Sequence, residues 1–560
     1  MKRAISSLCD IEFDLIIVGG GIFGACAAWD ATQRGLSVAL IEKDDFCNST
    51  SANSFKLVHG GMRYLQHGDL PRIRQSANAR RTLNRIAPHL VQPLPIVVPT
   101  YGHSLKGKEA LRVGLGIYDL LTLDRNSGIS DPQRWIPRGY CLSRNEVINR
   151  YPGLDATGLT GAGVFYDGQM YNPPRIVLAF LRTAQEAGAV VVNYVEARKF
   201  VLDGNRVSGV EAKDVPTGDE FVIRAKMVLN AAGPHAELLL AGSLKRPLAI
   251  PTPWSRDAYF VVSRPLVPGR EALALSATTR DPDALLSRGG RHLFLVPWRQ
   301  YTLVGVWHKV YTDHPDRYQV SQEEIECFID EINQAYSTVK ITSDDISYVN
   351  AGLILFGENT SHDDNQDLKF AHHSRLIDHA GERGIEGLVT LIGVRFTTGP
   401  SDAVAAIDII FQKLRKKTPP SKTHMLPLIG GKISHFESMV QDASHACPVA
   451  VEKETIRALV HNHGSAYPEI FQLIKQNAEW GQAVGCSTTL KAEIVNAVRH
   501  EMAITLNDVL LRRTDLGTGG FPGSQSIKTC AALMSAELQW SQSRMEQEIE
   551  AANTHFLIKK

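Results

Sequence analysis

One segment near the N-terminus restricts the possible folds of this chain more than any other. It begins with a short apolar strand at residues 13–18, continues as a helix rich in small residues, and ends in a second apolar strand at residues 37–41. This order predicts a βαβ unit, and therefore a parallel sheet with a right-handed crossover. Between the first strand and the helix lie three glycines, Gly19, Gly21 and Gly24.

These glycines have the spacing G-x-G-x-x-G, and an acid, Glu42, ends the second strand. The glycine pattern is weak alone, but in this structural context it is typical of dinucleotide binding. Gly19 permits a tight turn, Gly21 lets a pyrophosphate approach the backbone, and Gly24 lets helix and sheet pack closely. The helix N-terminus favours phosphates, and Glu42 can accept hydrogen bonds from ribose hydroxyls. The motif leaves flavin and nicotinamide open, and a glycine turn without a ligand is the remaining alternative.

Strand patterns continue to about residue 393. Residues 206–212 and 221–223 predict a β-ribbon across a polar turn, and a buried strand at 225–230 ends in Ala231-Ala-Gly-Pro234. Other strands are expected at 189–193, 258–262, 292–296, 302–306 and 388–393.

The chain changes character after a helix predicted at residues 401–414. Residues 413–422 are basic and contain two consecutive prolines, which a helix does not continue through. Beyond them the pattern is helical, with helices expected at 456–460, 469–476, 491–501, 506–513 and 530–552. We therefore predict a first region over residues 1–414, a linker over 415–431 and a C-terminal helical domain over 432–560.

The composition excludes several classes of function. Lys plus Arg is 60 and Asp plus Glu is 59, so no basic field for nucleic-acid binding is expected. Neither a transmembrane run nor a signal peptide is recognisable. The eight cysteines form no CxxC pair, which indicates reduced thiols of a cytoplasmic protein. The histidines lack metal-ligand spacing, so no metal site is predicted.

Residues 47–67 read CNSTSANSFKLVHGGMRYLQH. This segment resembles the flavin-dependent sn-glycerol-3-phosphate dehydrogenases, in which a T-S-x-x-S-x-K-L-x-H-G-G-x-R-Y-L motif follows the dinucleotide fold. Residues 87–90 and 498–517 resemble the same family, so the similarity covers nearly the whole chain. It implies an α/β fold: a two-dinucleotide-fold FAD-binding domain that is Rossmann-like and D-amino-acid-oxidase-like, a β-rich substrate domain and a C-terminal helical domain.

The resemblance also implies FAD as the cofactor. The chemistry expected is oxidation of a secondary alcohol by hydride transfer to flavin N5, with electrons passed to a quinone or another acceptor. The residues expected at the cofactor are Gly19, Gly21, Ile22, Phe23, Gly24, Glu42, Lys43, Thr50, Ser51, Ser54, Lys56, Leu57, His59, Gly60, Gly61, Ala232, Gly233, Gly393, Arg395, Phe396 and Thr397. One or two of the hydroxyl residues have helix capping as an alternative role.

The expected catalytic residues are His59, Arg63, Tyr64, Arg395 and Tyr259. His59 is the first choice for the base, with orientation of the flavin as its alternative, and Tyr259 is a weaker choice. Arg63 is interpreted as an anion clamp or a structural ion-pair partner. Arg395 is expected near the flavin N1/O2 region or in a salt bridge across the domain.

The substrate side departs from the family motifs. Ile354 stands where the family has an arginine, Arg395 where it has a lysine, and Tyr259 where it has a histidine. A phosphate dianion needs charge-assisted donors, and Ile354 offers none. Trp307, Tyr259 and Phe356 were expected to make the pocket more aromatic. The substrate expected is glycerol 3-phosphate or a related polyol phosphate; a larger or less charged hydroxyl or amine substrate, and a non-catalytic flavin-binding protein, are the alternatives.

One further segment concerns partners. Lys106, Lys108 and Arg112 precede the apolar residues 113–121, which fits an amphipathic helix on an anionic membrane surface as well as an ordinary packed helix. The resemblance favours the membrane, on the inner face of the cytoplasmic membrane. The oligomeric state is open, with a homodimer among the alternatives.

Overall fold

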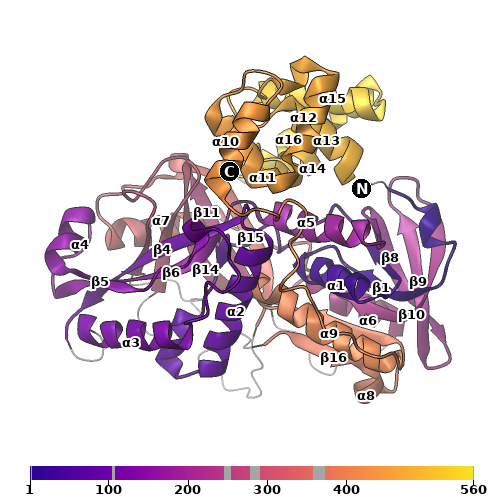
Figure 1. Ribbon diagram of the computed structural model, residues 1–560, viewed down its shortest axis with the longest axis horizontal. Coiled ribbons are helices and arrows are strands. Elements are labelled where there is room, and N and C mark those ends of the chain that lie inside the picture. The colour runs from indigo at the N-terminus through magenta and orange to yellow at the C-terminus, as the bar shows by residue number, and fades with distance from the viewer. Residues whose placement is uncertain (2, 104–106, 245–253, 278–290, 357–372, 559–560) are drawn as a thin grey trace.

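The computed structural model describes the chain except for residues 2, 104–106, 245–253, 278–290, 357–372 and 559–560. It has three parts, seen in Figure 1 as a sheet with helices on the right, a second sheet on the left, and a group of helices above both. They correspond to the Rossmann-like α/β part, the β-rich part and the C-terminal helical part that the sequence predicted.

The first sheet has eight strands in the order β16-β17-β10-β1-β2-β7, with β8 and β9 as a ribbon on β10. β1 is parallel to both β2 and β10, which confirms the predicted βαβ unit. The strands are β1 (Phe13–Val18), β2 (Val38–Ile41), β7 (Val190–Val192), β8 (Val195–Asp203), β9 (Arg206–Asp214), β10 (Glu220–Asn230), β16 (Arg375–Asp378) and β17 (Leu388–Ile392).

β10 corrects one detail of the sequence analysis. The strands expected at 221–223 and 225–230 are one continuous strand. Its first half pairs antiparallel with β9, and its second half pairs parallel with β1. One strand therefore belongs to both the ribbon and the core sheet, and the change of neighbours, not a turn, divides its apolar pattern.

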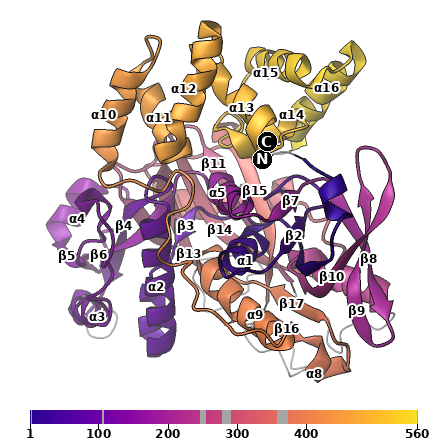
Figure 2. The same ribbon diagram turned by 45° about the vertical axis from the view of Figure 1, so that its right-hand side comes forward.

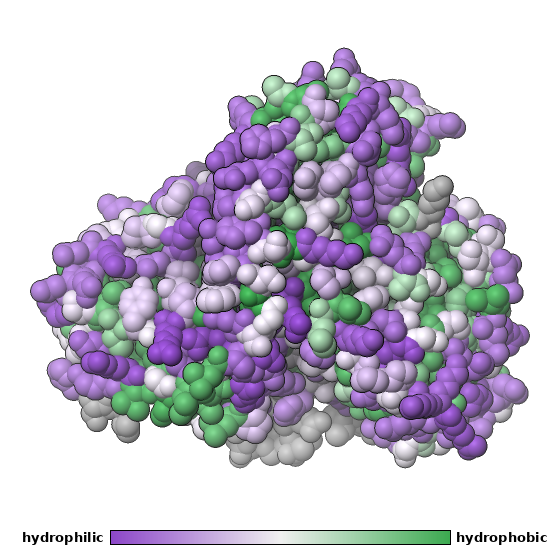
Figure 3. Space-filling view, viewed as in Figure 1, coloured by the Kyte–Doolittle hydropathy of each residue, from purple (hydrophilic) through white to green (hydrophobic). Residues whose placement is uncertain are grey.

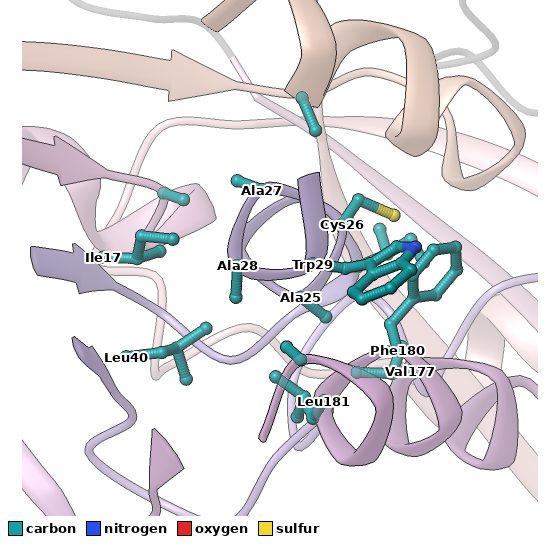
Figure 4. Packing of buried hydrophobic residues seen from close by; sticks show 14 of the residues in the cluster. Ile17, Ala25, Cys26, Ala27, Ala28, Trp29, Leu40, Val177, Phe180 and Leu181 are labelled. Atoms are coloured by element: carbon teal, nitrogen blue, oxygen red, sulfur yellow. The ribbon is translucent and has the colours of Figure 1, made fainter. Parts of the chain in front are cut away.

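Helix α1 (Ile22–Gln33) packs between this sheet and two other helices, α5 (Pro173–Glu186) and α9 (Gly399–Lys413). Its buried alanines let the backbone lie close to its neighbours, while Trp29 fills the space beside Phe180 of α5 (Figure 4). This close packing directs the N-terminus of α1 toward the carboxyl ends of the parallel strands, where α/β folds bind ligands.

The second sheet has nine strands in the order β15-β11-β14-β13-β12-β4-β6-β3, with β5 paired to β6. They are β3 (Leu57–Val58), β4 (Val91–Tyr101), β5 (Tyr140–Ser143), β6 (Leu159–Met170), β11 (Trp254–Val262), β12 (Ala272–Ala277), β13 (Arg291–Trp298), β14 (Tyr301–Tyr311) and β15 (Ile346–Leu355). The remaining helices of these two parts are α2 (Leu70–Ile86), α3 (Lys108–Leu121), α4 (Arg144–Arg150), α6 (Ala236–Leu244), α7 (Gln322–Ala335) and α8 (His379–Arg383).

The C-terminal helices lie across the top of both sheets in both views (Figures 1 and 2). They are α10 (Phe436–Ala446), α11 (Lys453–His463), α12 (Tyr467–Gln476), α13 (Lys491–Glu501), α14 (Leu506–Asp508), a π-helical turn η10 (Val509–Arg513), α15 (Ser524–Leu538) and α16 (Gln542–Ile558). The single helix expected at 530–552 is wrong. Gln539 has a φ of 54°, and this left-handed residue ends α15 before α16 begins.

α9 ends at Lys413, before the two prolines, as the sequence predicted. The assignment of residues 1–414, 415–431 and 432–560 to two domains and a linker stays a prediction. In the part of the chain that the structure describes, no helix combines the length and apolar character needed to cross a membrane.

Candidate active site

The two sheets enclose a cavity of about 2230 Å³, large enough for a dinucleotide together with a small substrate. Most of the residues expected at the cofactor line it: Gly19, Gly21, Ile22, Phe23, Glu42, Lys43, Thr50, Ser51, Ser54, Leu57, His59, Ala232, Gly233, Gly393, Arg395, Phe396 and Thr397. Tyr259 lines it as well. Five others that were expected in the site stand back from the cavity wall: Gly24, Lys56, Gly60, Gly61 and Tyr64. The side chain of Arg63 lies outside the described residues.

The glycine turn has the close contacts that its motif predicts. Gly19 has a φ of 112°, and a Cβ there would lie 2.5 Å from the carbonyl oxygen of Ala231. A Cβ on Gly24 would lie 1.9 Å from the carbonyl oxygen of Gly19, so any side chain would push α1 away from the turn. Gly21 lies on the cavity itself. The turn is therefore shaped to bring a dinucleotide pyrophosphate against the backbone and the N-terminus of α1.

Glu42 lies beside this turn at the end of β2. Its carboxylate accepts hydrogen bonds from the backbone N–H groups of Gly20 at 2.6 Å and Asp44 at 3.0 Å. Burial raises the pKa of Glu42 to about 7, although the hydrogen bonds from these two donors lower it. The carboxylate faces the cavity where ribose hydroxyls of a bound dinucleotide would add further donors.

Residues 48–51 continue this wall toward the second sheet. Ser51 Oγ accepts a hydrogen bond from the Ile22 backbone at 3.1 Å, which is the helix-capping role left open by the sequence. Thr50 Oγ1 donates to the carbonyl of Leu353 in β15 at 2.9 Å. The segment thus connects the dinucleotide turn to the sheet of the β-rich part.

His59 is exposed, with 52% of its side chain accessible. Its Nδ1 lies 3.4 Å from a carboxylate oxygen of Asp167 in β6. Asp167 is buried and also accepts from the Gly60 backbone at 2.7 Å and from Arg80 at 3.3 Å. A carboxylate that accepts Nδ1–H leaves Nε2 as the basic nitrogen of the ring. Asp167 was not predicted from the sequence, because nothing in the strand pattern of β6 distinguishes it.

Arg395 and Tyr64 come together, as the sequence analysis expected of a common site. Arg395 donates to the Tyr64 hydroxyl at 2.8 Å and to Ser76 Oγ at 3.2 Å. The Arg72 guanidinium lies 4.7 Å from the centre of the same Tyr64 ring, so two cations flank one phenol. We call Arg395 and Arg72, with Tyr64 between them, the cationic corner. The backbone N–H of His59 donates to Thr397 Oγ1 at 3.3 Å, and Thr397 is two residues after Arg395, so the cationic corner adjoins the histidine.

Tyr259 has a structural role in this geometry. Its hydroxyl donates to the carbonyl of Ser54 at 2.8 Å and accepts from Lys56 Nζ at 2.5 Å. Burial raises the pKa of Tyr259 well above its usual value, which does not favour it as a base. Burial also lowers the pKa of Lys56 to about 7, and its side chain lies behind the cavity wall over the ring of Trp298. Lys56 therefore lies behind the residues that line the cavity, and its expected contact with the cofactor stays a prediction.

A second histidine–carboxylate pair faces the cavity from the same nine-stranded sheet that carries Asp167. His308 Nδ1 lies 2.7 Å from Asp257, on neighbouring strands β14 and β11. Ile354 lies on the same wall. The sequence analysis did not single out Asp257, because the strand register that pairs it with His308 is not visible in the chain.

The expectation of a more aromatic pocket is wrong for two residues. Trp307 is 2% exposed and packs against Phe260 and against Phe328 of α7, behind the sheet. Phe356 is also buried and does not line the cavity. Neighbouring residues of a strand point to opposite faces, so Trp307 turns away from the cavity that His308 faces.

Comparison with known proteins agrees with this geometry. Residues 14–399 match the family described as FAD dependent oxidoreductase, and residues 421–545 match the C-terminal domain of alpha-glycerophosphate oxidase. The chain is therefore an FAD-dependent oxidoreductase, and its glycine turn, Glu42 and cavity fit that cofactor.

Its relatives narrow the class. The chain is 31% identical to the mitochondrial glycerol-3-phosphate dehydrogenase of Mus musculus, over 98% of this chain and 73% of that protein. It is 29% identical to the glycerol-3-phosphate dehydrogenase of Synechocystis sp., over 98% of this chain and 97% of that protein. The chain belongs to the glycerol-3-phosphate dehydrogenase family. The crystal structure of the Bacillus halodurans glycerol-3-phosphate dehydrogenase with FAD has the same fold, with a TM-score of 0.77 at 22% identity, covering 99% of this chain and 96% of that one.

Proposed function

We propose that this protein oxidises the secondary hydroxyl of sn-glycerol 3-phosphate to a ketone, with FAD as the electron acceptor. The observation that carries the proposal is the juxtaposition of His59, backed by Asp167, with the cationic corner around Arg395 in a cavity built for a dinucleotide. A base and an anion clamp a short distance apart suit a small phosphorylated alcohol.

The residues divide the work as follows. FAD, when bound, supplies the acceptor for the hydride that leaves the substrate carbon. His59 Nε2 takes the proton of the hydroxyl, and Asp167 stabilises the resulting imidazolium through Nδ1–H. Arg395 holds the phosphate, and its contact with Tyr64 keeps the guanidinium in place. The contacts of residues 48–51 with α1 and β15 set the orientation of the cofactor against this group.

The first experiment is anaerobic bleaching of the bound flavin on addition of sn-glycerol 3-phosphate. Rapid bleaching supports the proposal. Bleaching by dithionite but not by glycerol 3-phosphate would contradict it, and would favour the second candidate, a larger or less charged hydroxyl substrate. The observation behind that candidate is Ile354, an apolar side chain on the cavity wall where the family motif has an arginine. A flavin that no polyol or sugar phosphate bleaches would point to the non-catalytic alternative.

We also propose that the electrons pass on to a quinone at the inner face of the cytoplasmic membrane, and that α3 contacts the lipid. Val113 is 64% exposed, Ile117 44% and Leu120 69%, on the face of α3 opposite the buried Leu115. A patch of apolar residues is visible in this region of the surface (Figure 3). Val113 and Ile117 also line the cavity, so the apolar surface is continuous with its mouth. Apolar surface beside Lys108 and Arg112 suits an anionic lipid surface; Lys106 lies outside the described residues.

Sedimentation with vesicles of anionic phospholipid tests this surface. The protein is expected to sediment at low salt, and a V113E/L120E variant is expected to stay in the supernatant. The matched control is L202E/V222E, two exposed apolar residues on the β8–β10 ribbon. Equal binding by both variants would contradict a role for α3. Analytical ultracentrifugation of the same samples decides whether the protein is a homodimer.

A further inference from the structure

Residues 45–51, the dinucleotide loop, contribute one wall of the cavity that fits FAD, through residues 47–51. Cys47, Asn48, Ser49, Thr50 and Ser51 all line the cavity. The backbone N–H of Cys47 donates to the carbonyl of Gly20 at 3.1 Å, and Ser51 caps α1. Because this loop is joined to the glycine turn at both points, its conformation sets the shape of the site.

The start of this loop is held from the C-terminal helical part. Asp45 is 1% exposed and accepts from Arg512 Nε at 2.6 Å. Arg513 donates to both oxygens of the same carboxylate, at 2.7 and 2.6 Å. Burial alone would raise the pKa of Asp45, but the two guanidinium groups hold it below its usual value. Arg512 also donates to Asn48 Oδ1 at 2.8 Å, so one side chain fixes two positions of the loop.

The two consecutive arginines that reach this carboxylate lie in a π-helical turn, η10. Single π turns are frequent at functional sites. The turn is braced on both sides. Arg512 donates to Asp508 at 2.8 Å, and Arg513 donates to the carbonyl of Glu501 at 3.0 Å.

A buried ion pair is a poor way to gain stability alone, because desolvation of the charges offsets much of their attraction. Apolar side chains at this boundary would pack the two parts together at least as well. The charged contacts also fix the orientation and distance of the Asp45 carboxylate relative to the two guanidinium groups, because a bidentate contact has a defined geometry. The ion pair lies at the loop that lines the cofactor cavity. This location indicates that the fixed geometry of the ion pair serves to position that loop.

We infer that the C-terminal helical part completes the FAD site, with Arg512 and Arg513 as positioning residues that hold the dinucleotide loop in its FAD-binding conformation. FAD affinity then depends on residues that lie far from the FAD-binding fold in the sequence. This inference goes beyond the proposed reaction and does not depend on which alcohol is oxidised.

The test is Arg512→Met in the full-length protein, with FAD removed and then titrated back while its fluorescence is followed. This variant leaves no buried carboxylate alone, since Asp45 keeps Arg513 and Asp508 keeps Tyr194 at 2.7 Å. Loss of charge-assisted hydrogen bonds to the loop is expected to weaken FAD binding by on the order of tenfold or more. Because no substrate is added, failure of the proposed reaction does not affect the result.

The matched control is Arg182→Met. Arg182 of α5 is also buried and joins the same two parts of the molecule, through Glu469 at 2.8 Å and Glu501 at 3.2 Å, without contacting the dinucleotide loop. It is expected to lower the melting temperature of the FAD-free protein but to leave FAD affinity within about twofold. Equal weakening by both variants, or unchanged affinity in Arg512→Met, would overturn the inference. If Arg512→Met does not fold, Arg512→Lys decides: a single ammonium does not reproduce the contacts with both Asp45 and Asn48, so FAD affinity must still fall.

Discussion

At the scale of single residues, more than one histidine–carboxylate pair lies at the cavity, including His59 with Asp167, His308 with Asp257 and His235 with Asp316, and the proposed reaction needs one base. His59 with Asp167 adjoins the cationic corner at Arg395, whereas His308 with Asp257 lies on β14 and β11, next to β15, which carries Ile354. The hydrogen bond from His59 to Thr397, two residues after Arg395, therefore favours His59. The two carboxylates can be compared by the same substitution, which keeps side-chain volume and removes charge.

We predict that Asp167→Asn slows anaerobic reduction of the flavin by glycerol 3-phosphate by about a hundredfold, with FAD content unchanged. The amide no longer stabilises the imidazolium that forms at His59, and general-base catalysis is typically worth 10² to 10⁴-fold, roughly. Stopped-flow absorbance measures the rate, and Asp257→Asn is the control, expected to stay within about threefold. The opposite ranking would assign the base to His308.

Sequence and structure agree best where a residue is required by the backbone. Gly19, Gly21, Gly24 and Glu42 were predicted because a tight turn, a close approach and a strand end leave few choices of residue type. Asp167 was missed because its role arises from a contact 108 positions away in the chain. Tyr259 was the weaker choice of base and stands where the family motif has a histidine, and its hydrogen bonds to Ser54 and Lys56 depend on tertiary packing that the sequence does not show.

At the scale of elements, local signals predicted the strands and helices well, except where no local signal marks a boundary. The run 530–552 has helical periodicity throughout, and neither glycine nor proline marks the break at Gln539. Likewise, the two uses of β10 depend on partners that are far away in the chain. Helix α1 could be predicted from local sequence, because its small residues indicate the close packing seen in Figure 4.

We predict that two glycine-to-alanine substitutions in helices have opposite effects on stability. Gly24→Ala places a Cβ 1.9 Å from the Gly19 carbonyl oxygen and is expected to lower the free energy of unfolding by about 2 kcal/mol. Gly116→Ala in α3 meets nothing within 4 Å and is expected to raise it by about 0.5–1 kcal/mol. Urea unfolding of the FAD-free proteins measures both. A Gly24→Ala protein as stable as the wild type would contradict the close contact between α1 and the turn.

At the scale of the whole molecule, the boundary between the C-terminal helices and the rest contains buried charged and polar side chains. Besides the arginines around Asp45, this boundary contains two buried histidines, His89 and His461. The ring Nδ1 of His461 donates a hydrogen bond to the backbone carbonyl of His89 at 2.8 Å. His461 also stacks on Tyr171 at 4.2 Å between ring centres. Burial lowers the pKa of His89 to about 3, helped by Arg175, Arg134 and His463, and burial lowers the pKa of His461 well below its usual value.

This burial makes stability depend on pH with a definite sign. Both histidines have a lower pKa in the folded protein than in the unfolded chain, where it is about 6.5, so the unfolded chain binds more protons below that pH. The contribution of these two histidines to the free energy of unfolding is therefore fully present above about pH 6.5, where both are neutral, and is lost as the pH falls toward 3. Between pH 6.5 and 5 each histidine is expected to lower the free energy of unfolding by about 2 kcal/mol.

Urea unfolding of the FAD-free protein at pH 7.5, 6 and 5 measures this dependence. His461→Gln keeps a polar group near the His89 carbonyl but cannot be protonated in this range, so the variant is expected to lose about half of the decrease between pH 6.5 and 5. The control is His445→Gln, an exposed histidine of α10, which is expected to leave the decrease unchanged. An unchanged decrease in His461→Gln would mean that groups other than this boundary histidine unfold the protein in mild acid.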